Sequence, residues 1–211
     1  AFMGGIKRLL TKRNIDTSLV PFLVSMMATL LKVMLAITVM TMLGIEMTSF
    51  IAILGSAGLA VGLALSGTLQ NFAGGVIILI LKPFKVGDFV EAQGFAGVIK
   101  EIQIFNTILT TGDNKTIILP NGPLSTSSLV NYSTQSTRRV DMTFGIGYND
   151  NIKKTKEVLI SLVNADERIS KDPEPFVAVS ELADSTVNFI VKVWVNSGDY
   201  WGVFYDMQEK V

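Results

Sequence analysis

A stretch dominated by the smallest side chains, AILGSAGLAVGLALSG at residues 52–67, constrains this chain more than any other feature. Nine of the thirteen residues from Gly55 to Gly67 are Gly, Ala or Ser. A helix of this composition is poor in water, because each glycine costs about 1 kcal/mol relative to alanine. In a bilayer the composition is favourable, because small residues let apolar helices approach closely and pack by dispersion. The stretch therefore predicts a membrane helix that packs against other helices.

On a helical wheel at about 100° per residue, the small residues form two faces with a narrow leucine stripe, Leu59 and Leu63, between them. Val61 lies on the far side of the wheel. Two small faces suit a ring of identical helices, each touching a neighbour on both sides, with Leu59 and Leu63 pointing at the axis as the pore gate. A single GxxxG-type dimer, which needs only one small face, is the alternative. The residues expected to pack the pore helix are Ala52, Gly55, Ser56, Gly58, Ala60, Gly62 and Ala64.

Composition narrows the function classes. The chain has 211 residues, of which 49% are hydrophobic and 17% charged, so a membrane segment is expected. Zero net charge gives no general case for nucleic-acid binding. The absence of His and Cys removes the commonest general base and the commonest metal ligands. No phosphate-binding or nucleophile motif is present. We therefore expect no enzymatic activity, no cofactor, no metal and no nucleic-acid partner.

The first apolar run, residues 17–43, contains 27 residues and one charge, Lys32. At about 1.5 Å per residue it reaches about 40 Å, which is enough to cross the bilayer with some tilt. Lys32 lies in mid-span. It either forms an ion pair with another element of the pore assembly or extends towards a lipid headgroup.

The second apolar run, residues 47–82, is too long for one straight span, since its 35 uncharged residues would reach over about 50 Å. We expect a pore-lining part over about 50–66, a kink near 67, and a second helix over 68–81. Gly67, Gly74 and Gly75 are the candidate hinge, because glycine weakens a helix and permits a bend.

Basic residues predict the orientation. The segment 1–16, interpreted as a cytoplasmic basic segment or the end of a preceding span, carries Lys7, Arg8, Lys12 and Arg13, which are expected to face anionic lipids. Lys82 and Lys85 follow the second span, and the turn between the spans has no Lys or Arg. The positive-inside bias then places both ends of the hairpin in the cytoplasm.

Two further domains are expected. Residues 83–133 have short strand patterns at Asp88–Gln93, Val98–Phe105, Thr107–Thr111, Thr116–Leu119 and Leu129–Tyr132, typical of a small barrel. A four-residue turn at 94–97 and a loop beginning at Pro120 separate some of them. Residues 134–211 have a β-α-β-β-α pattern that resembles a ferredoxin-like α+β domain. Its first helix has Ile152, Leu159, Ile160 and Val163 on one face, and Asp199 is expected to cap its last helix.

The run GSAGLAVGLALSGTLQNFAGGVIILILKPFKVGDFV and the later ILPNG resemble the small-conductance mechanosensitive channel family over nearly the whole chain. The resemblance implies a homoheptamer in the bacterial inner membrane, with a glycine hinge at Gly67. It also implies a Sm-like β domain and an α+β domain that continues after residue 211, in the cytoplasm. The implied function is a poorly selective channel that releases ions and small osmolytes on hypo-osmotic shock. A membrane-anchored oligomeric scaffold and a secondary transporter are the alternatives.

Overall fold

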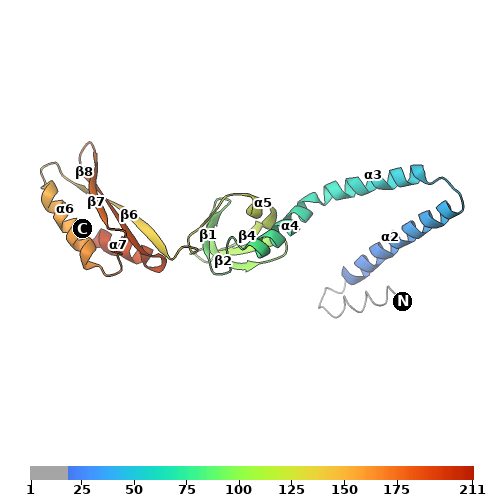
Figure 1. Ribbon diagram of the computed structural model, residues 1–211, viewed down its shortest axis with the longest axis horizontal. Coiled ribbons are helices and arrows are strands. Elements are labelled where there is room, and N and C mark those ends of the chain that lie inside the picture. The colour runs from blue at the N-terminus through green and yellow to red at the C-terminus, as the bar shows by residue number, and fades with distance from the viewer. Residues whose placement is uncertain (1–18) are drawn as a thin grey trace. The chain divides into compact units, whose positions relative to one another are not determined.

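The computed structural model describes residues 19–211 (Figure 1). The chain divides into two compact units, residues 1–66 and 67–211, and each is described by itself. The predicted basic residues Lys7, Arg8, Lys12 and Arg13 lie outside the described residues, as does the predicted segment 1–16.

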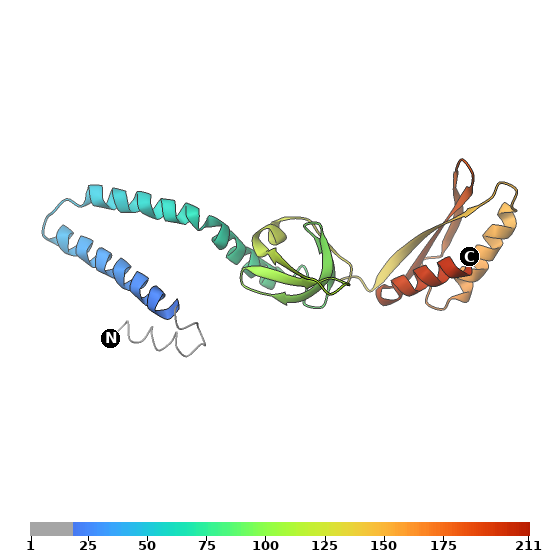
Figure 2. The same cartoon turned by 180° about the vertical axis from the view of Figure 1, so that it is seen from behind.

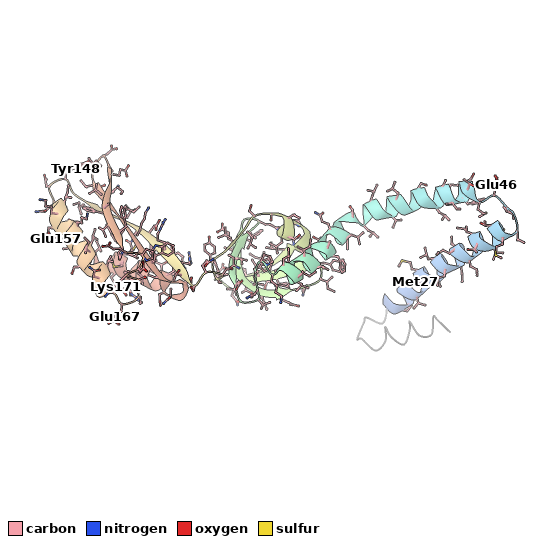
Figure 3. All side chains as sticks on the ribbon, viewed as in Figure 1. Met27, Glu46, Tyr148, Glu157, Glu167 and Lys171 are labelled. Atoms are coloured by element: carbon pink, nitrogen blue, oxygen red, sulfur yellow. The ribbon has the colours of Figure 1, made fainter. Side chains whose placement is uncertain are left out.

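The first unit contains two apolar helices, α2 (Leu19–Met42) and α3 (Thr48–Ala64). They are joined by a turn in which Gly44 has a φ of +78° and Glu46 precedes α3 (Figure 3). One described segment, Val24–Met42 of α2, is long and apolar enough to cross a membrane by itself. α3 meets that criterion only when it is taken together with the following helix, α4 (Ser66–Leu81).

The helical run predicted to bend near Gly67 is interrupted at Leu65. The amide of Leu65 still donates to the Val61 carbonyl at 3.0 Å, which completes α3, but its ψ has moved to 0°. Gly67 lies inside the first turn of α4, and Gly74 and Gly75 lie within its continuous part. The observed second helix therefore begins two residues before the predicted one.

The β domain is an antiparallel five-stranded sheet in the order β4-β3-β2-β1-β5. Its elements are β1 (Phe89–Ala92), β2 (Phe95–Ile102), β3 (Asn106–Thr110), β4 (Thr116–Pro120), α5 (Asn121–Thr126) and β5 (Leu129–Asn131). Ile78 of α4 is fully buried in the core of this domain, together with Phe84, Val90 and Leu109. The second half of the long helical run is therefore part of the β domain.

Two local predictions in this domain are wrong. The turn between β1 and β2 consists of Gln93 and Gly94, both at positive φ, and residues 95–97 already belong to β2. The tight turn pairs Ala92 with Phe95, so the strands meet earlier than the glycine spacing indicated. The expected loop after Pro120 is the short helix α5, because Asn121 and Leu124 find buried partners beneath it.

The C-terminal domain has the predicted β-α-β-β-α order and a three-stranded antiparallel sheet, β6-β8-β7. Its elements are β6 (Thr137–Ile146), α6 (Ile152–Ala165), β7 (Phe176–Leu182), β8 (Val187–Asn196), the 3-10 turn η1 (Ser197–Asp199) and α7 (Tyr200–Lys210). Both helices pack on the same face of the sheet (Figure 2). In β8 every second residue is valine or phenylalanine, and these side chains all enter the one core that both helices cover.

Two side-chain predictions in this domain are also wrong. Ile152 and Ile160 are 46% and 40% exposed, so only Leu159 and Val163 of the expected α6 face are buried. Asp199 precedes α7 but its side chain makes no capping hydrogen bond, because η1 already supplies a turn there.

A charged cluster attaches α7 to the loop after α6. The Arg168 guanidinium donates to Asp166 at 2.6 Å and to Asp206 of α7 at 2.6 Å. The hydrogen bond from Arg168 lowers the pKa of Asp166 below its ordinary 3.8, although burial opposes the shift. Because the folded pKa lies below the unfolded value, the stabilisation is complete above pH 3.8 and is lost as the pH falls through the folded pKa.

We therefore expect the melting temperature to fall more steeply below pH 3.8 in the parent protein than in Asp166→Asn. Thermal unfolding from neutral to acidic pH measures this difference. The exposed Asp184→Asn variant is the control and is expected to follow the parent curve. Parallel curves for the parent and Asp166→Asn would contradict the assignment.

Candidate functional site

α3 has no buried residue within a single chain. The predicted gate residues Leu59 and Leu63 are 65% and 67% exposed. Gly55, Gly58 and Gly62 have no described atom within 4 Å of the place that a Cβ would occupy, neighbouring helix backbone aside. The small faces are therefore open for contacts from outside the chain, and an exposed apolar helix of this kind needs other helices or lipid around it.

The remaining predicted packing residues, Ala52, Ser56, Ala60 and Ala64, are also exposed on α3. The Ser56 hydroxyl donates to the Ile53 carbonyl at 2.8 Å, so it is satisfied within the helix. A single chain does not bring leucines of different copies together, and the gate and packing assignments stay predictions.

In contrast to the exposed α3, α4 packs closely on the β domain through two of its predicted hinge glycines. A Cβ on Gly74 would lie 2.4 Å from the Asn121 carbonyl oxygen, and one on Gly75 would lie 2.3 Å from the Ile104 carbonyl oxygen. Real Cβ atoms do not approach backbone this closely. Gly74 and Gly75 therefore permit close packing of α4, whereas Gly67 has open space around it. The hinge role of all three stays a prediction.

Asn121 lies fully buried at the centre of this contact. Its Oδ1 accepts from the Thr107 hydroxyl at 2.8 Å, and its Nδ2 donates to the carbonyls of Gln103 at 2.8 Å and Ile104 at 3.2 Å. These bonds satisfy the amide without water. The loop before β3 and the start of α5 are thereby fixed to each other.

A separate hydrogen bond joins α4 directly to α5. The Gly122 amide donates to Asn71 Oδ1 at 2.8 Å, and Asn71 lies 51 positions earlier in the chain. The rings of Phe72 and Phe105 add an aromatic contact with centroids 6.3 Å apart. We call the contacts made by Asn71, Gly74, Gly75, Asn121 and Gly122 the helix anchor. The helix anchor thus fixes α4 to the β domain.

Sequence reasoning missed the helix anchor. The sequence predicts only a glycine-containing bend in the segment that carries Asn71 and a loop in the segment that carries Asn121. The available signal was an asparagine within three residues of a glycine in both segments, QNFAGG and PNG. Nothing in the sequence alone indicated that the two segments meet.

Replacing Asn121 with alanine should destabilise the β domain, because the Thr107 hydroxyl and two carbonyls would lose their buried partner. The expected cost is about 1–3 kcal/mol. Thermal unfolding of the purified protein in detergent measures it. Asn164→Ala, at an exposed position of α6, is the matched control and should leave the melting temperature unchanged. Equal melting temperatures for Asn121→Ala and the control would refute the role of the network.

Among residues 19–211, no group of three His, Cys, Asp or Glu side chains could hold a metal ion. The features that distinguish the described chain are an unpartnered helix of small residues and a tightly anchored one.

Comparisons with known proteins place these features in a family. Residues 67–134 match the model described as mechanosensitive ion channel, beta-domain, and residues 140–211 match mechanosensitive ion channel MscS, C-terminal. A small-conductance mechanosensitive channel from Edwardsiella ictaluri is 42% identical over 205 residues, which cover 96% of this chain and 71% of that protein. The chain belongs to the MscS family of mechanosensitive channels. The resemblance found in the pore-helix motif is therefore confirmed, and the family consists of membrane ion channels rather than enzymes.

Other MscS relatives extend the comparison. A small-conductance mechanosensitive channel from Helicobacter pylori is 32% identical over 197 residues, covering 93% of this chain and 70% of that protein. The crystal structure of Helicobacter pylori MscS in a closed state matches with a TM-score of 0.89 at 30% identity, covering 99% of this chain and 82% of that one. Arabidopsis thaliana MSL1 shares the fold, with a TM-score of 0.81 at 19% identity, covering 99% of this chain and 76% of that one. The MscS fold thus comprises the transmembrane helical region and both β-rich domains.

Proposed function

We propose that copies of this chain assemble a poorly selective pore that opens under membrane tension and releases ions and small osmolytes. The supporting observation is the exposure of α3, a helix with two small-residue faces and a leucine stripe in a member of the MscS family. Both small-residue faces of such a helix can pack closely against identical helices from neighbouring copies.

In this proposal, Leu59 and Leu63 from each copy form two apolar rings. A narrow apolar throat excludes water and stops ions without full steric closure. The charge-free sequence of α3 also explains poor selectivity, because neither a ring of charges nor a ring of carbonyls is available.

Tension acts through area. If the open assembly occupies more area in the plane of the membrane than the closed one, stretching the membrane shifts the population towards the open state. The small faces favour such a change, because glycine and alanine surfaces slide past each other without interlocking side chains.

The family also supports a more detailed architecture. We propose a homoheptamer in the bacterial inner membrane, in contact with lipids, with the β-rich domains in the cytoplasm. The five-stranded sheet with α5 is compatible with a Sm-like β domain, and two helices on one face of a three-stranded sheet are compatible with a ferredoxin-like domain. We further propose that α2 and the pair α3–α4 form two spans.

Gly67→Ala tests the hinge cleanly, because an added Cβ would meet no described atom within 4 Å. The substitution should therefore stiffen the backbone by about 1 kcal/mol of helix propensity without a clash. We expect altered closing or inactivation kinetics in patch recordings, without a loss of thermal stability. Unchanged kinetics would place the hinge elsewhere.

The proposed function is tested by reconstituting the purified protein alone into liposomes and applying suction to an excised patch. We expect discrete currents that appear above a tension threshold and are absent from empty liposomes. A membrane-anchored scaffold would give no current. A secondary transporter would give solute flux without tension-dependent steps, and either result would contradict the proposal.

A further inference from the structure

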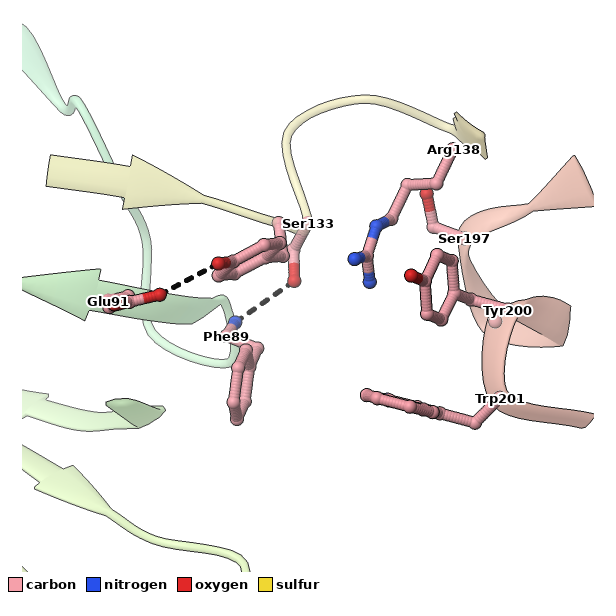
Figure 4. A pocket seen from close by; sticks show the side chains of 9 residues that line it. Phe89, Glu91, Ser133, Arg138, Ser197, Tyr200 and Trp201 are labelled. Atoms are coloured by element: carbon pink, nitrogen blue, oxygen red, sulfur yellow. Dashed lines mark hydrogen bonds between the residues drawn. The ribbon is translucent and has the colours of Figure 1, made fainter. Parts of the chain in front are cut away.

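A cavity of about 640 Å³ opens where the β domain meets the C-terminal domain within the second unit (Figure 4). This volume is typical of small-molecule sites. Its walls combine aromatic rings with a guanidinium and a carboxylate, supplied by Phe89, Glu91, Tyr132, Arg138, Tyr200 and Trp201. Nothing in the gating proposal uses this cavity.

The connection between the two domains is fixed on both sides of the cavity. On the β-domain side, the Phe89 amide donates to the Ser133 hydroxyl at 2.9 Å. On the other side, the Ser197 amide donates to the Ser136 carbonyl at 2.8 Å, and its hydroxyl donates to the Gln135 carbonyl at 2.6 Å. The walls are therefore held in place by hydrogen bonds before any ligand binds.

Arg138 provides an anion-binding group. Its guanidinium lies 3.9 Å from the centroid of the Tyr200 ring and 4.8 Å from that of Tyr132. Among the described residues no carboxylate pairs with it, whereas the neighbouring Arg139 is paired with Asp141 at 2.6 Å. Because the rings occupy the faces of the guanidinium, its N–H edges remain to donate to a ligand. A carboxylate matches that fork-like edge.

The aromatic walls provide a place for a rounded cation. Phe89 is tilted by 52° from Tyr132, and Tyr200 and Trp201 meet edge-to-face at 83°. Figure 4 shows Phe89 and Trp201 on opposite sides of the cavity, below Arg138. Faces turned in several directions surround a trimethylammonium group better than they stack on a flat base, and such groups bind aromatic faces by cation–π attraction.

Glu91 completes the charge pattern. It accepts a hydrogen bond from the Tyr132 hydroxyl at 2.7 Å, and this bond raises the pKa of Tyr132 above its ordinary 10.0. The hydroxyl therefore stays protonated at neutral pH, and the carboxylate adds negative charge on the β-domain side of the cavity. The cavity thus carries one cationic and one anionic side chain among its aromatic rings.

We propose that this cavity binds a small zwitterion of the betaine class, with its carboxylate on Arg138 and its quaternary ammonium between Phe89 and Trp201. The ligand contacts both domains at once. Its binding is measured without any conductance, so failure of this proposal and failure of tension gating are separate results.

Equilibrium dialysis of the purified full chain in detergent, with radiolabelled glycine betaine, tests the site. We expect saturable binding of glycine betaine. Choline carries only its quaternary ammonium and acetate only its carboxylate, so each should compete with an affinity at least roughly tenfold lower than that of unlabelled glycine betaine. Adenosine monophosphate, a planar anion, should compete no better than acetate. Tight competition by the nucleotide or by choline alone would overturn the zwitterion assignment.

Three variants locate the binding. Arg138→Gln should weaken binding at least roughly tenfold, because a charged hydrogen bond is lost. Trp201→Leu, at a side chain that is 57% exposed, should weaken it roughly fivefold through the lost cation–π contact while preserving the fold. Arg139→Gln is the control and should bind like the parent. Parent-like binding by a folded Arg138→Gln or Trp201→Leu protein would overturn the proposal, as would the absence of saturable binding.

Discussion

Serine in place of Leu59 or Leu63 is expected to make the closed channel leak. In the proposed assembly each substitution places a ring of hydroxyl groups in the narrowest part of the pore. Hydroxyl groups hydrogen-bond to water, so the throat fills and ions pass in the absence of tension. A change of about 1.4 kcal/mol in the free energy of wetting alters the occupancy of the throat by water about tenfold. Every copy in the assembly carries the substitution, so each contributes a hydroxyl group to this free energy.

The leak is measured in two ways. Cells that express Leu59→Ser or Leu63→Ser should grow poorly, and liposome patches held without suction should carry a resting current at least about tenfold above that of the parent. Val61→Ser is the matched control, because Val61 is similarly exposed at 59% but lies on the far side of the wheel. If the control leaks and the leucine variants do not, the pore-lining face has been assigned to the wrong side of α3.

The second large effect is expected from Gly74→Ala. The added methyl carbon would lie 2.4 Å from the Asn121 carbonyl oxygen, 2.6 Å from its carbon and 2.8 Å from the Gly122 nitrogen. These are backbone atoms, so no side-chain rotation relieves the overlap. α4 must move away from the β domain, which strains the Asn71–Gly122 hydrogen bond. Overpacking of this kind costs about 1–3 kcal/mol.

Thermal unfolding in detergent and limited proteolysis both report this effect. Gly74→Ala should melt at a lower temperature and expose the segment between α4 and β1 to cleavage. Gly112→Ala is the control. It is the same substitution in the second unit, but at Gly112 an added Cβ would meet no described atom within 4 Å. An equal melting temperature and an equal cleavage pattern in the two variants would show that the helix anchor does not constrain α4.

Much of the C-terminal domain was predictable because its strands have a strong period of two. The strands β7, Phe176–Leu182, and β8, Val187–Asn196, take the third and fourth places of the predicted β-α-β-β-α order. The features that could not be predicted from the sequence depend on local backbone hydrogen bonding. The Gln93–Gly94 turn, the break at Leu65 and the uncapped start of α7 each depend on backbone geometry that side-chain patterns do not specify.

The candidate site also has a part that could be predicted from the sequence and a part that could not. The leucine stripe of α3 follows from spacing along one helix, so Leu59 and Leu63 could be selected from the sequence. The helix anchor depends on contacts such as that between Asn71 and Gly122, which are 51 residues apart. Glycine in α4 therefore pointed only to flexibility, whereas the structure places Gly74 and Gly75 in close packing.

The central claim is that one face of α3 lines the conducting pore, and the absence of cysteine from the chain allows a direct measurement. Single variants Leu59→Cys, Leu63→Cys and Val61→Cys are reconstituted, opened by suction, and exposed to a membrane-impermeant, positively charged thiol reagent. We predict that the current through Leu59→Cys and Leu63→Cys channels falls irreversibly, while Val61→Cys channels are unaffected. Modification that reduces the current at Val61→Cys and spares both leucine positions would contradict the account.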